Sequence, residues 1–225
     1  MTEVGRGAGA ACEFDHLIVG AHTLEQGAAY VEELLGVAPQ AGGRHLVMGT
    51  HNRVLRLGVR AYLEIIAIDP AGEAPSRPRW FGMDDEKLRA RLREGPRLLT
   101  WAARTKNIDA ALERAQKTPG VIHPMSRGDY TWRITIPDDG ALISGGLMPT
   151  LIQWDCAAHP ADQLEDRGCE FLKISGHHPA AAAIAAIAAT LAALDLERTV
   201  TLAPGGEARM SATIRGPRGI RVITS

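Results

Sequence analysis

Aromatic side chains, cysteines and an excess of either charge are all scarce in this sequence. Phenylalanine, tryptophan and tyrosine make up only 4% of the 225 residues, too few for the aromatic platforms on which single-stranded nucleic acids stack. Lysine and arginine number 25 against 26 aspartates and glutamates, which gives a formal net charge of -1. No local basic run interrupts this balance, so the composition predicts no nucleic-acid partner.

The three cysteines, Cys12, Cys156 and Cys169, are odd in number and show no Cys-x-x-Cys spacing. This pattern argues against a disulfide framework or a zinc–cysteine site, and it favours a reducing compartment. The first six residues contain no apolar run of the signal-peptide type, so we expect a cytoplasmic protein.

The most apolar stretch, residues 179–194, carries no formal charge and is mostly alanine. It is shorter than the roughly 20 residues that cross a bilayer. Its large apolar side chains fall on one helical stripe: Ile184, Ile187, Leu191 and Leu194. This periodicity predicts a helix that packs on the protein's own core, and we expect no membrane partner.

One order of elements, strand–helix–strand–strand–strand, is predicted three times along the chain. In the first copy a short buried strand precedes a helix that Thr23 caps and Gly36 ends. Three strands are then predicted, at residues 44–49, 52–58 and 61–68. Two hairpin-like strands after each helix argue against an open parallel sheet, in which every strand would need a crossover connection.

The same order returns after residues 70–96, which are rich in proline, arginine and glutamate and are predicted as a connecting segment with a short helix near 84–93. In the second copy Asn107 caps the helix, and the third copy contains the alanine-rich helix, opened by Pro179. We therefore predict an α+β fold of repeated βαβββ modules that form a cupped mixed sheet. The predicted modules are residues 12–69, 97–156 and 168–225, the last with the weakest pattern.

The segments FDHLIVGAHTLEQGAAYVEELLGV, GTHNRVLRLG and YLEIIAID of the first module resemble the glyoxalase-like domain of the vicinal oxygen chelate superfamily. The resemblance covers residues 14–155 as two modules. It implies that the paired modules form a cup around a small-molecule site. In many members a divalent metal is held there by His and Glu residues from the first and last strands of each module.

Two residues match those ligand positions, His16 on the first strand and Glu64 on the last strand of module one. Strand alternation puts Glu64 on one face with Tyr62 and the neighbouring isoleucines, where a buried carboxylate needs a cation, a hydrogen-bond donor or a raised pKa. The hypothesis is that His16 and Glu64 bind a divalent metal and that Glu64 also carries protons in catalysis. The alternative is that Glu64 faces solvent or pairs with Arg53 or Arg56, and that His16 is a hydrogen-bonded core residue.

Substrate-binding roles are predicted for four further residues: His51, Tyr62, Trp101 and Gln153. Module two departs from the family's metal-ligand pattern, because Thr100 aligns with His16 and Gln153 stands where a second carboxylate is expected. A glutamine carbonyl is a neutral, weak ligand. A complete four-ligand metal site is therefore not evident within the chain, which disfavours glyoxalase I isomerisation.

His45, His123 and His159 lie near turns or proline, and we interpret them as solvated. No Gly-rich nucleotide fingerprint, nucleophile elbow or Walker sequence is present in the sequence. The histidines outside the predicted site therefore suggest no second catalytic centre.

Two main function hypotheses follow. The first is a glyoxalase-like small-molecule enzyme, a lyase, isomerase or dioxygenase, that uses a divalent metal to bind vicinal oxygens of its substrate. The second is a metal-free binding or sequestration protein of the bleomycin-resistance type, which uses the same cup. An interaction protein with a vestigial cup is a third alternative, and a homodimer is left open.

Overall fold

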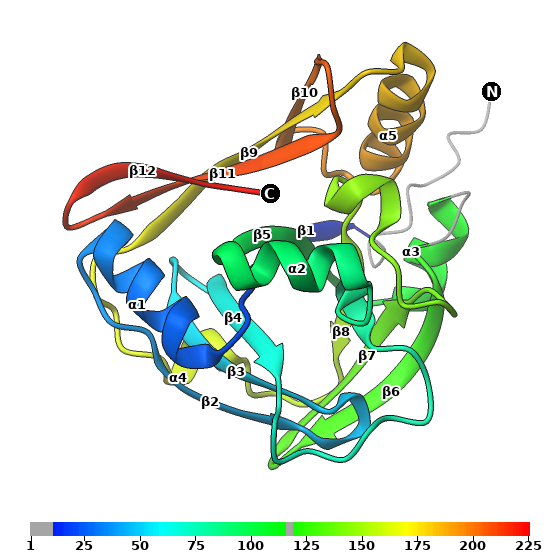
Figure 1. Ribbon diagram of the computed structural model, residues 1–225. Helices are drawn as coiled ribbons and strands as arrows, with labels where there is room; N and C mark the ends of the chain where they lie inside the picture. Colours follow the sequence, from blue (N-terminus) through cyan, green and yellow to red (C-terminus); the bar gives the residue numbers. More distant parts are fainter. Residues whose placement is uncertain (1–10, 116–118) are drawn as a thin grey trace.

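The computed structural model describes residues 11–115 and 119–225. Two copies of a strand–helix–strand–strand–strand unit build its larger part (Figure 1). The first copy consists of β1 (Cys12–Gly20), α1 (Leu24–Leu35), β2 (Gln40–His45), β3 (Thr50–Arg56) and β4 (Tyr62–Ile68). The second consists of β5 (Arg97–Thr105), α3 (Ile108–Arg114), β6 (Val121–Arg127), β7 (Tyr130–Ile136) and β8 (Thr150–Trp154). Between them lies α2 (Glu86–Glu94), and α4 (Pro160–Gln163) follows β8.

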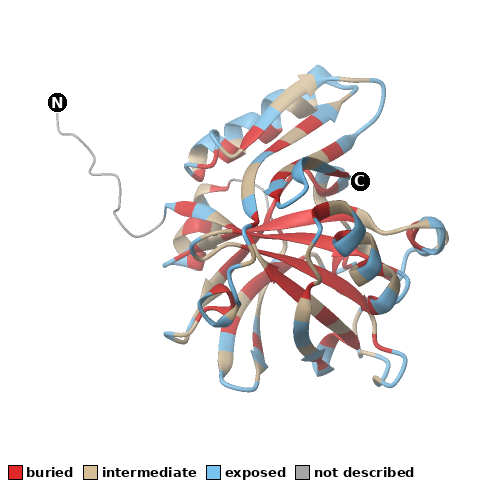
Figure 2. Cartoon of the chain, turned by 90° about the vertical axis from the view of Figure 1, so that its left-hand side faces the viewer, coloured by how far each residue is buried: buried red, intermediate tan, exposed pale blue. Residues whose placement is uncertain are grey.

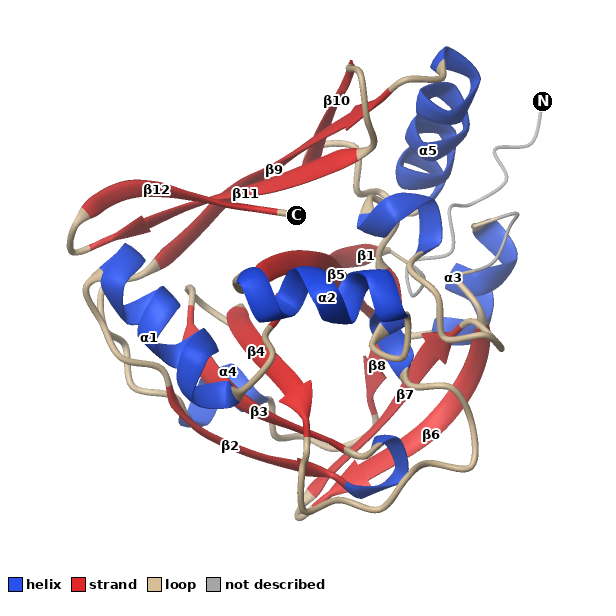
Figure 3. Cartoon of the chain, in the orientation of Figure 1, coloured by secondary structure: helices blue, strands red, loops and turns tan. Residues whose placement is uncertain are grey.

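Within the described residues, the strands of the two copies form one eight-stranded sheet in the order β2-β3-β4-β1-β5-β8-β7-β6. In each copy the first strand runs parallel to the last, β1 beside β4 and β5 beside β8. The two copies join through the antiparallel pair β1–β5. Because the edge strands β2 and β6 approach each other, the sheet curls into a half-barrel (Figure 3). This confirms the predicted α+β fold with a cupped mixed sheet.

The predicted helix caps are present. The Thr23 hydroxyl accepts the amide hydrogen of Gln26 at 3.2 Å, which satisfies a backbone group that the first turn of α1 leaves open. Gly36 ends the helix with a φ of 83°, a left-handed conformation that costs glycine little. The side chain of Asn107 caps α3 in the same way, at 3.1 Å from the amide of Ala110.

The third unit has the predicted order of elements but pairs its strands differently. It consists of β9 (Glu170–His178), α5 (Ala181–Ala193), β10 (Val200–Pro204), β11 (Arg209–Gly216) and β12 (Gly219–Thr224). These strands form a separate sheet in the order β10-β9-β11-β12, in which β9 runs parallel to β10. Its apolar side chains join α1, α3 and the outer face of the large sheet in one core cluster, and the buried residues of the large sheet lie beneath it (Figure 2).

Helix α5 contributes the predicted apolar stripe to this outer core. Ile187, Leu191 and Leu194 are buried, and Ile184 is half-buried at the start of the stripe. The helix begins after its N-cap Ala180, so Pro179 precedes the first turn and does not lie within it. None of the helices in the described ranges is long and apolar enough to span a bilayer.

The segment 70–96, predicted as a connection with a short helix near 84–93, contains α2 and covers the concave face of the large sheet (Figure 1). Trp80, Phe81 and Leu88 are buried there in one cluster with sheet residues such as Ile18. Phe81 has a φ of 59°, a left-handed conformation that is unfavourable for a residue with a bulky side chain. The cup is therefore closed over much of its width by the chain that joins its two halves.

Candidate functional site

The inner face of the cup encloses a small cavity of about 30 Å³. Strand alternation turns His16 of β1, Asn52 of β3 and Glu64 of β4 toward it. From the other module Arg127 of β6 reaches the same cavity, and Trp80 of the covering segment lines it. A cavity of this size has room for one or two waters or a small ion.

Glu64 is the buried acid of this site, with 6% of its surface exposed. The Asn52 side-chain amide donates to Glu64 Oε1 at 2.6 Å, which compensates part of the cost of burying a carboxylate. The other oxygen, Oε2, lies 3.8 Å from Nε2 of His16. That separation is too long for a hydrogen bond, so both atoms face each other without a direct bond.

A β-bulge places a second acid behind His16. Phe14 and His16 pair with the consecutive residues Ala103 and Ala102 of β5, which leaves Asp15 as an extra residue in β1. The bulge interrupts the alternation of the strand. Asp15 therefore lies beside the ring of His16 instead of on the opposite face, with its Oδ1 at 2.6 Å from Nδ1 of His16.

Asp15 is fully buried and ionised. Its second oxygen lies 3.0 Å from Nε2 of His159 and accepts from the indole N–H of Trp154 at 3.2 Å. Burial alone would raise the pKa of Asp15, but the hydrogen bonds from His159 and His16 outweigh it and hold the pKa well below the usual range. An ionised Asp15 can only accept, so Nδ1 of His16 donates its proton to Asp15 and Nε2 is the nitrogen that faces Glu64.

His45 joins the site from the end of β2. Its Nδ1 lies 3.1 Å from the Thr50 hydroxyl, and its Nε2 accepts from Nη1 of Arg127 at 3.1 Å. Burial, opposed by the Glu64 carboxylate and reinforced by the Arg127 cation, lowers the pKa of His45 to about 4. His45 is therefore neutral at pH 7 and holds the guanidinium in place, together with Asn52 Oδ1 at 3.2 Å from the same nitrogen.

The interpretation of His45 and His159 as solvated is wrong, since both are buried, with 7% and 0% of their surfaces exposed. Both histidines lie beside turns in the sequence. The sequence does not show that segment 70–96 packs over His45 or that α4 begins at His159. His123 is half-buried and lies against the Arg77 guanidinium, outside this site.

Of the predicted substrate-binding residues, Tyr62 lies in the cavity wall. Its ring stacks on the His16 imidazole with 4.4 Å between the centroids. Burial and the nearby carboxylates of Asp15 and Glu64 raise the pKa of Tyr62 well above its usual value, so its phenol keeps its proton.

The structure places Trp101 and Gln153 away from the cavity. Trp101 is fully buried on the outer face of the sheet, and its indole donates to the Leu147 carbonyl at 3.1 Å. Gln153 points to the start of α3, where its Oε1 accepts the Ile108 amide hydrogen at 2.9 Å. Both residues serve the packing of module two.

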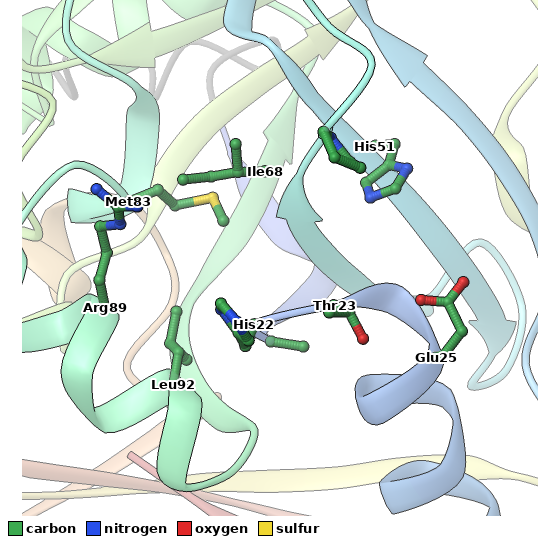
Figure 4. Close-up of a pocket in the computed structure, with 10 residues that line it drawn as sticks. His22, Thr23, Glu25, His51, Ile68, Met83, Arg89 and Leu92 are labelled. Atoms are coloured by element: carbon green, nitrogen blue, oxygen red, sulfur yellow. The ribbon is translucent and has the colours of Figure 1, made fainter.

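His51 lies in a separate pocket of about 410 Å³. It neighbours Asn52 on β3, so its side chain points to the opposite side of that strand. Figure 4 shows it across the pocket from Met83 and Arg89, with His22 and Glu25 of the α1 region. The sequence correctly predicts a polar residue of β3 in the cup. That residue is Asn52 and not the predicted His51, because the two neighbours point to opposite faces of the strand.

The donor set of the cup does not complete a divalent-metal site. In the described part of the chain, two atoms of the cup that could ligate a metal make no hydrogen bond, His16 Nε2 and Glu64 Oε2. The third, Nε2 of His45, accepts from Arg127 and is not free to ligate. Side chains that module two adds to the cavity are apolar or aromatic, such as Ile152, apart from the Arg127 cation. Catalytic metal sites generally use at least three protein ligands. Among the described residues, no group of three His, Cys, Asp or Glu has suitable geometry.

The comparisons with known proteins agree with this architecture. The profile of a family described as "Glyoxalase-like domain" matches residues 14–193. The chain belongs to this glyoxalase-like domain family. A search of curated proteins finds no match. Membership of this family is consistent with the paired modules and the cup.

Solved structures that are similar to this chain include the following three. A hypothetical protein from Staphylococcus aureus is similar with a TM-score of 0.60 and 12% identity, over 88% of each chain. A methylmalonyl-CoA epimerase from Mycobacterium tuberculosis matches with a TM-score of 0.40 and 16% identity, over 64% of this chain and 88% of that one. A mutant 4-hydroxymandelate synthase from Streptomyces coelicolor matches with a TM-score of 0.47 and 16% identity, over 96% of this chain and 63% of that one.

Several residues of the site are not identified by sequence reasoning, and the five that matter most for its chemistry are Asp15, His45, Asn52, Trp80 and Arg127. The segments that the sequence assigns to module one contain three of them, but choosing Asn52 over His51 requires the strand register. Arg127 is the last residue of β6, and nothing local to it in the sequence indicates a partner in the other module.

Proposed function

We propose that this glyoxalase-like chain is a small-molecule enzyme that moves a proton on its substrate without a bound metal. The observation that carries the proposal is the arrangement of His16 and Glu64. Two buried ionisable groups face each other at 3.8 Å, with neither Nε2 nor Oε2 hydrogen-bonded in the described residues. Closely apposed acid and imidazole groups in a buried site are typical of acid–base catalysis.

Each of the two groups is held in a working orientation. His16 presents Nε2 as a base because Asp15 holds the proton on Nδ1. Glu64 keeps one oxygen on Asn52 and leaves the other free. One of these two bases would take a proton from a substrate C–H or O–H, and the protonated base would return it to another atom of the resulting enolate. This is the chemistry of an isomerase or a lyase that forms an enolate.

Arg127 supplies the positive charge that such a reaction needs. An enolate oxygen formed in the cavity would be stabilised by a fixed guanidinium, in the way that preorganised donors stabilise developing charge. His45 and Asn52 both accept from Nη1 of the guanidinium. The other nitrogens keep their N–H groups for a substrate oxygen. Arg127 would thus act where many relatives use a divalent ion.

We infer that the covering segment moves when a substrate enters, because the cavity of about 30 Å³ holds little more than water. Trp80 and Phe81 form the part of the cover that touches the cavity. Closure over a bound substrate would exclude water and strengthen the interaction with Arg127.

A metal-free binding protein is the second candidate, favoured by the aromatic wall of Trp80, Trp132 and Trp154. Such a wall suits an apolar or cationic ligand. Binding alone would need neither the bulge at Asp15 nor the open Nε2 of His16, which is why the enzyme is preferred.

The test is proton exchange in D₂O, followed by NMR, with a panel of 2-oxo acids and 2-hydroxy ketones. We expect loss of the α-proton signal of at least one compound with the wild-type protein, in the presence of EDTA, and none with Glu64→Gln. Equal exchange by both proteins contradicts the proposal. Binding by saturation transfer without any exchange supports the second candidate.

A further inference from the structure

A second pocket opens at the ends of β1 and β4, between the start of α1 and the helix α2 (Figure 4). Its volume is about 410 Å³, within the range of small-molecule sites. It shares no lining residue with the cup cavity. The pocket is therefore a separate space that the chemistry proposed for the cup does not use.

The floor of this pocket is apolar. Ile68 comes from the end of β4, Met83 from the covering segment and Leu92 from α2. Met83 and Leu92 are almost fully buried, and Ile68 is half-buried. Figure 4 shows Ile68 and Met83 facing each other across one end of the pocket, with Leu92 below them. Such a surface favours a hydrocarbon chain or ring over water.

Three nitrogen-bearing side chains surround the apolar floor. Arg89 lies on the same side as Met83, and His22 and His51 lie along the other walls (Figure 4). Within the described segments none of these side chains donates or accepts a hydrogen bond. Glu25 supplies a lining carboxylate, on the His51 side and across the pocket from Arg89. Arg89 is exposed at this end of the pocket and interacts electrostatically with Asp84, which leaves guanidinium N–H groups available to a ligand.

We propose that this pocket binds a small amphipathic carboxylate, with its acid group on Arg89 and its hydrocarbon part on Ile68, Met83 and Leu92. The guanidinium offers paired N–H donors that fit a carboxylate. A neutral ligand would make no use of the Arg89 charge, and the second acid group of a dianion would meet Glu25. A monocarboxylic acid with an apolar tail suits both ends of the pocket.

The experiment is calorimetric titration of the full chain with octanoate, with octan-1-ol as the uncharged probe. We expect saturable 1:1 binding of octanoate. We expect about tenfold weaker binding by Arg89→Ala, the loss of one charge-assisted contact, and unchanged affinity for octan-1-ol. Arg93→Ala is the matched control, since Arg93 is exposed on the same helix and does not line the pocket.

A second measurement locates the ligand. The sequence has six methionines, and ¹³C-methyl labelling should show octanoate shifting the Met83 resonance, assigned with Met83→Leu. Ile68→Ser should weaken octanoate and octan-1-ol alike. No saturable binding at millimolar octanoate, or binding that Arg89→Ala and Ile68→Ser leave unchanged, overturns the proposal. Glu64→Gln should bind octanoate normally, so a failure of the cup chemistry does not affect this result.

Discussion

The guanidinium of Arg127 donates from Nη1 to the side-chain oxygen of Asn52 at 3.2 Å, across 75 positions of sequence. Arg127 is the last residue of β6, one edge of the half-barrel, and Asn52 lies in β3 beside the other edge strand β2. The same nitrogen also lies 3.1 Å from His45. The Arg127 side chain therefore links the two modules at the candidate site.

Removing this link should destabilise the protein. Arg127→Met leaves the buried His45 Nε2 without a donor and Asn52 Oδ1 with the Gly43 amide alone, at 2.7 Å. We therefore expect a loss of about 1–3 kcal/mol in the free energy of unfolding. Urea denaturation measures it. The control is Arg133→Met, whose pairs with Asp109 and Asp155 are exposed and should contribute less than about 1 kcal/mol. Equal losses in the two variants would contradict the role of Arg127.

His45 should make stability fall as pH is lowered below about 6.5. The unfolded chain binds a proton at this imidazole near pH 6.5, whereas the folded chain does so only near pH 4. Between these values the unfolded state holds more protons, so acid favours unfolding. The expected loss from pH 7 to pH 4 is on the order of 3 kcal/mol from this group.

The pH effect is checked with urea denaturation at several pH values. His45→Gln cannot titrate and should flatten the decline between pH 6.5 and pH 4, values set by the unfolded and folded pKa of this group. The exposed His177 gives the matched control, His177→Gln, which should decline like the wild type. A wild-type profile that is flat over this range would contradict the prediction.

Two buried tryptophans should respond differently to loss of the indole N–H. The Nε1 of Trp80 is buried and has no hydrogen-bond partner among the described residues, whereas that of Trp101 donates to the Leu147 carbonyl. We expect Trp101→Phe to cost about 1–2 kcal/mol more than Trp80→Phe, because it leaves a buried carbonyl unpaired. Chemical denaturation of both variants tests this, and a larger loss for Trp80→Phe would refute it.

Helix α5 should depend on its buried stripe. Ile187→Asp places an unpaired carboxylate in the core and should cost several kcal/mol, about 3 or more. Ala185→Asp, on the exposed side of the same helix, controls for the change in helix propensity and charge. The melting temperatures of the two variants decide the matter, since similar values would mean that the stripe does not pack as described.

Metal should not be required for stability. Because His45 accepts from Arg127, a divalent ion would find two ligands, His16 and Glu64. We expect protein purified without a histidine tag to contain well under one equivalent of zinc, manganese, iron or nickel by mass spectrometry. Its melting temperature should not change with EDTA. Stoichiometric metal that His16→Ala removes would contradict this prediction.

The sequence predicts most of the fold, because its signals are local. The stripe of α5, the cap residues Thr23 and Asn107, and the alternation around Glu64 each depend on near neighbours in the chain. The Gly-containing strand β2 (Gln40–His45) is less well predicted, at 44–49, since Gly42 and Gly43 resemble a turn. In the structure these glycines leave room for neighbouring side chains: a Cβ on Gly43 would collide with the Arg127 side chain.

The site is predicted only in part, because its missing members depend on register and on distant contacts. His16, Tyr62 and Glu64 are found by alternation and by family position. The bulge at Asp15 shifts the pairing of β1 with β5 by one residue. No residue type near Asp15 in the sequence predicts this bulge. Arg127 needs the closure of the whole half-barrel before it meets Asn52.

The pairing of the third unit has a consequence for the order of folding. In that unit β9 lies beside β10, the next strand in the chain, so that residues 174 and 200 are partners. In the large sheet β1 pairs with β4, which comes three strands later in the chain, and residues 16 and 62 are partners. The loop that this pairing closes is therefore longer. Contacts between sequence neighbours close smaller loops and form faster. The small sheet should therefore assemble before the large one, and the last and slowest contact should be the meeting of β6 with β2 at the two ends of the large sheet's strand order.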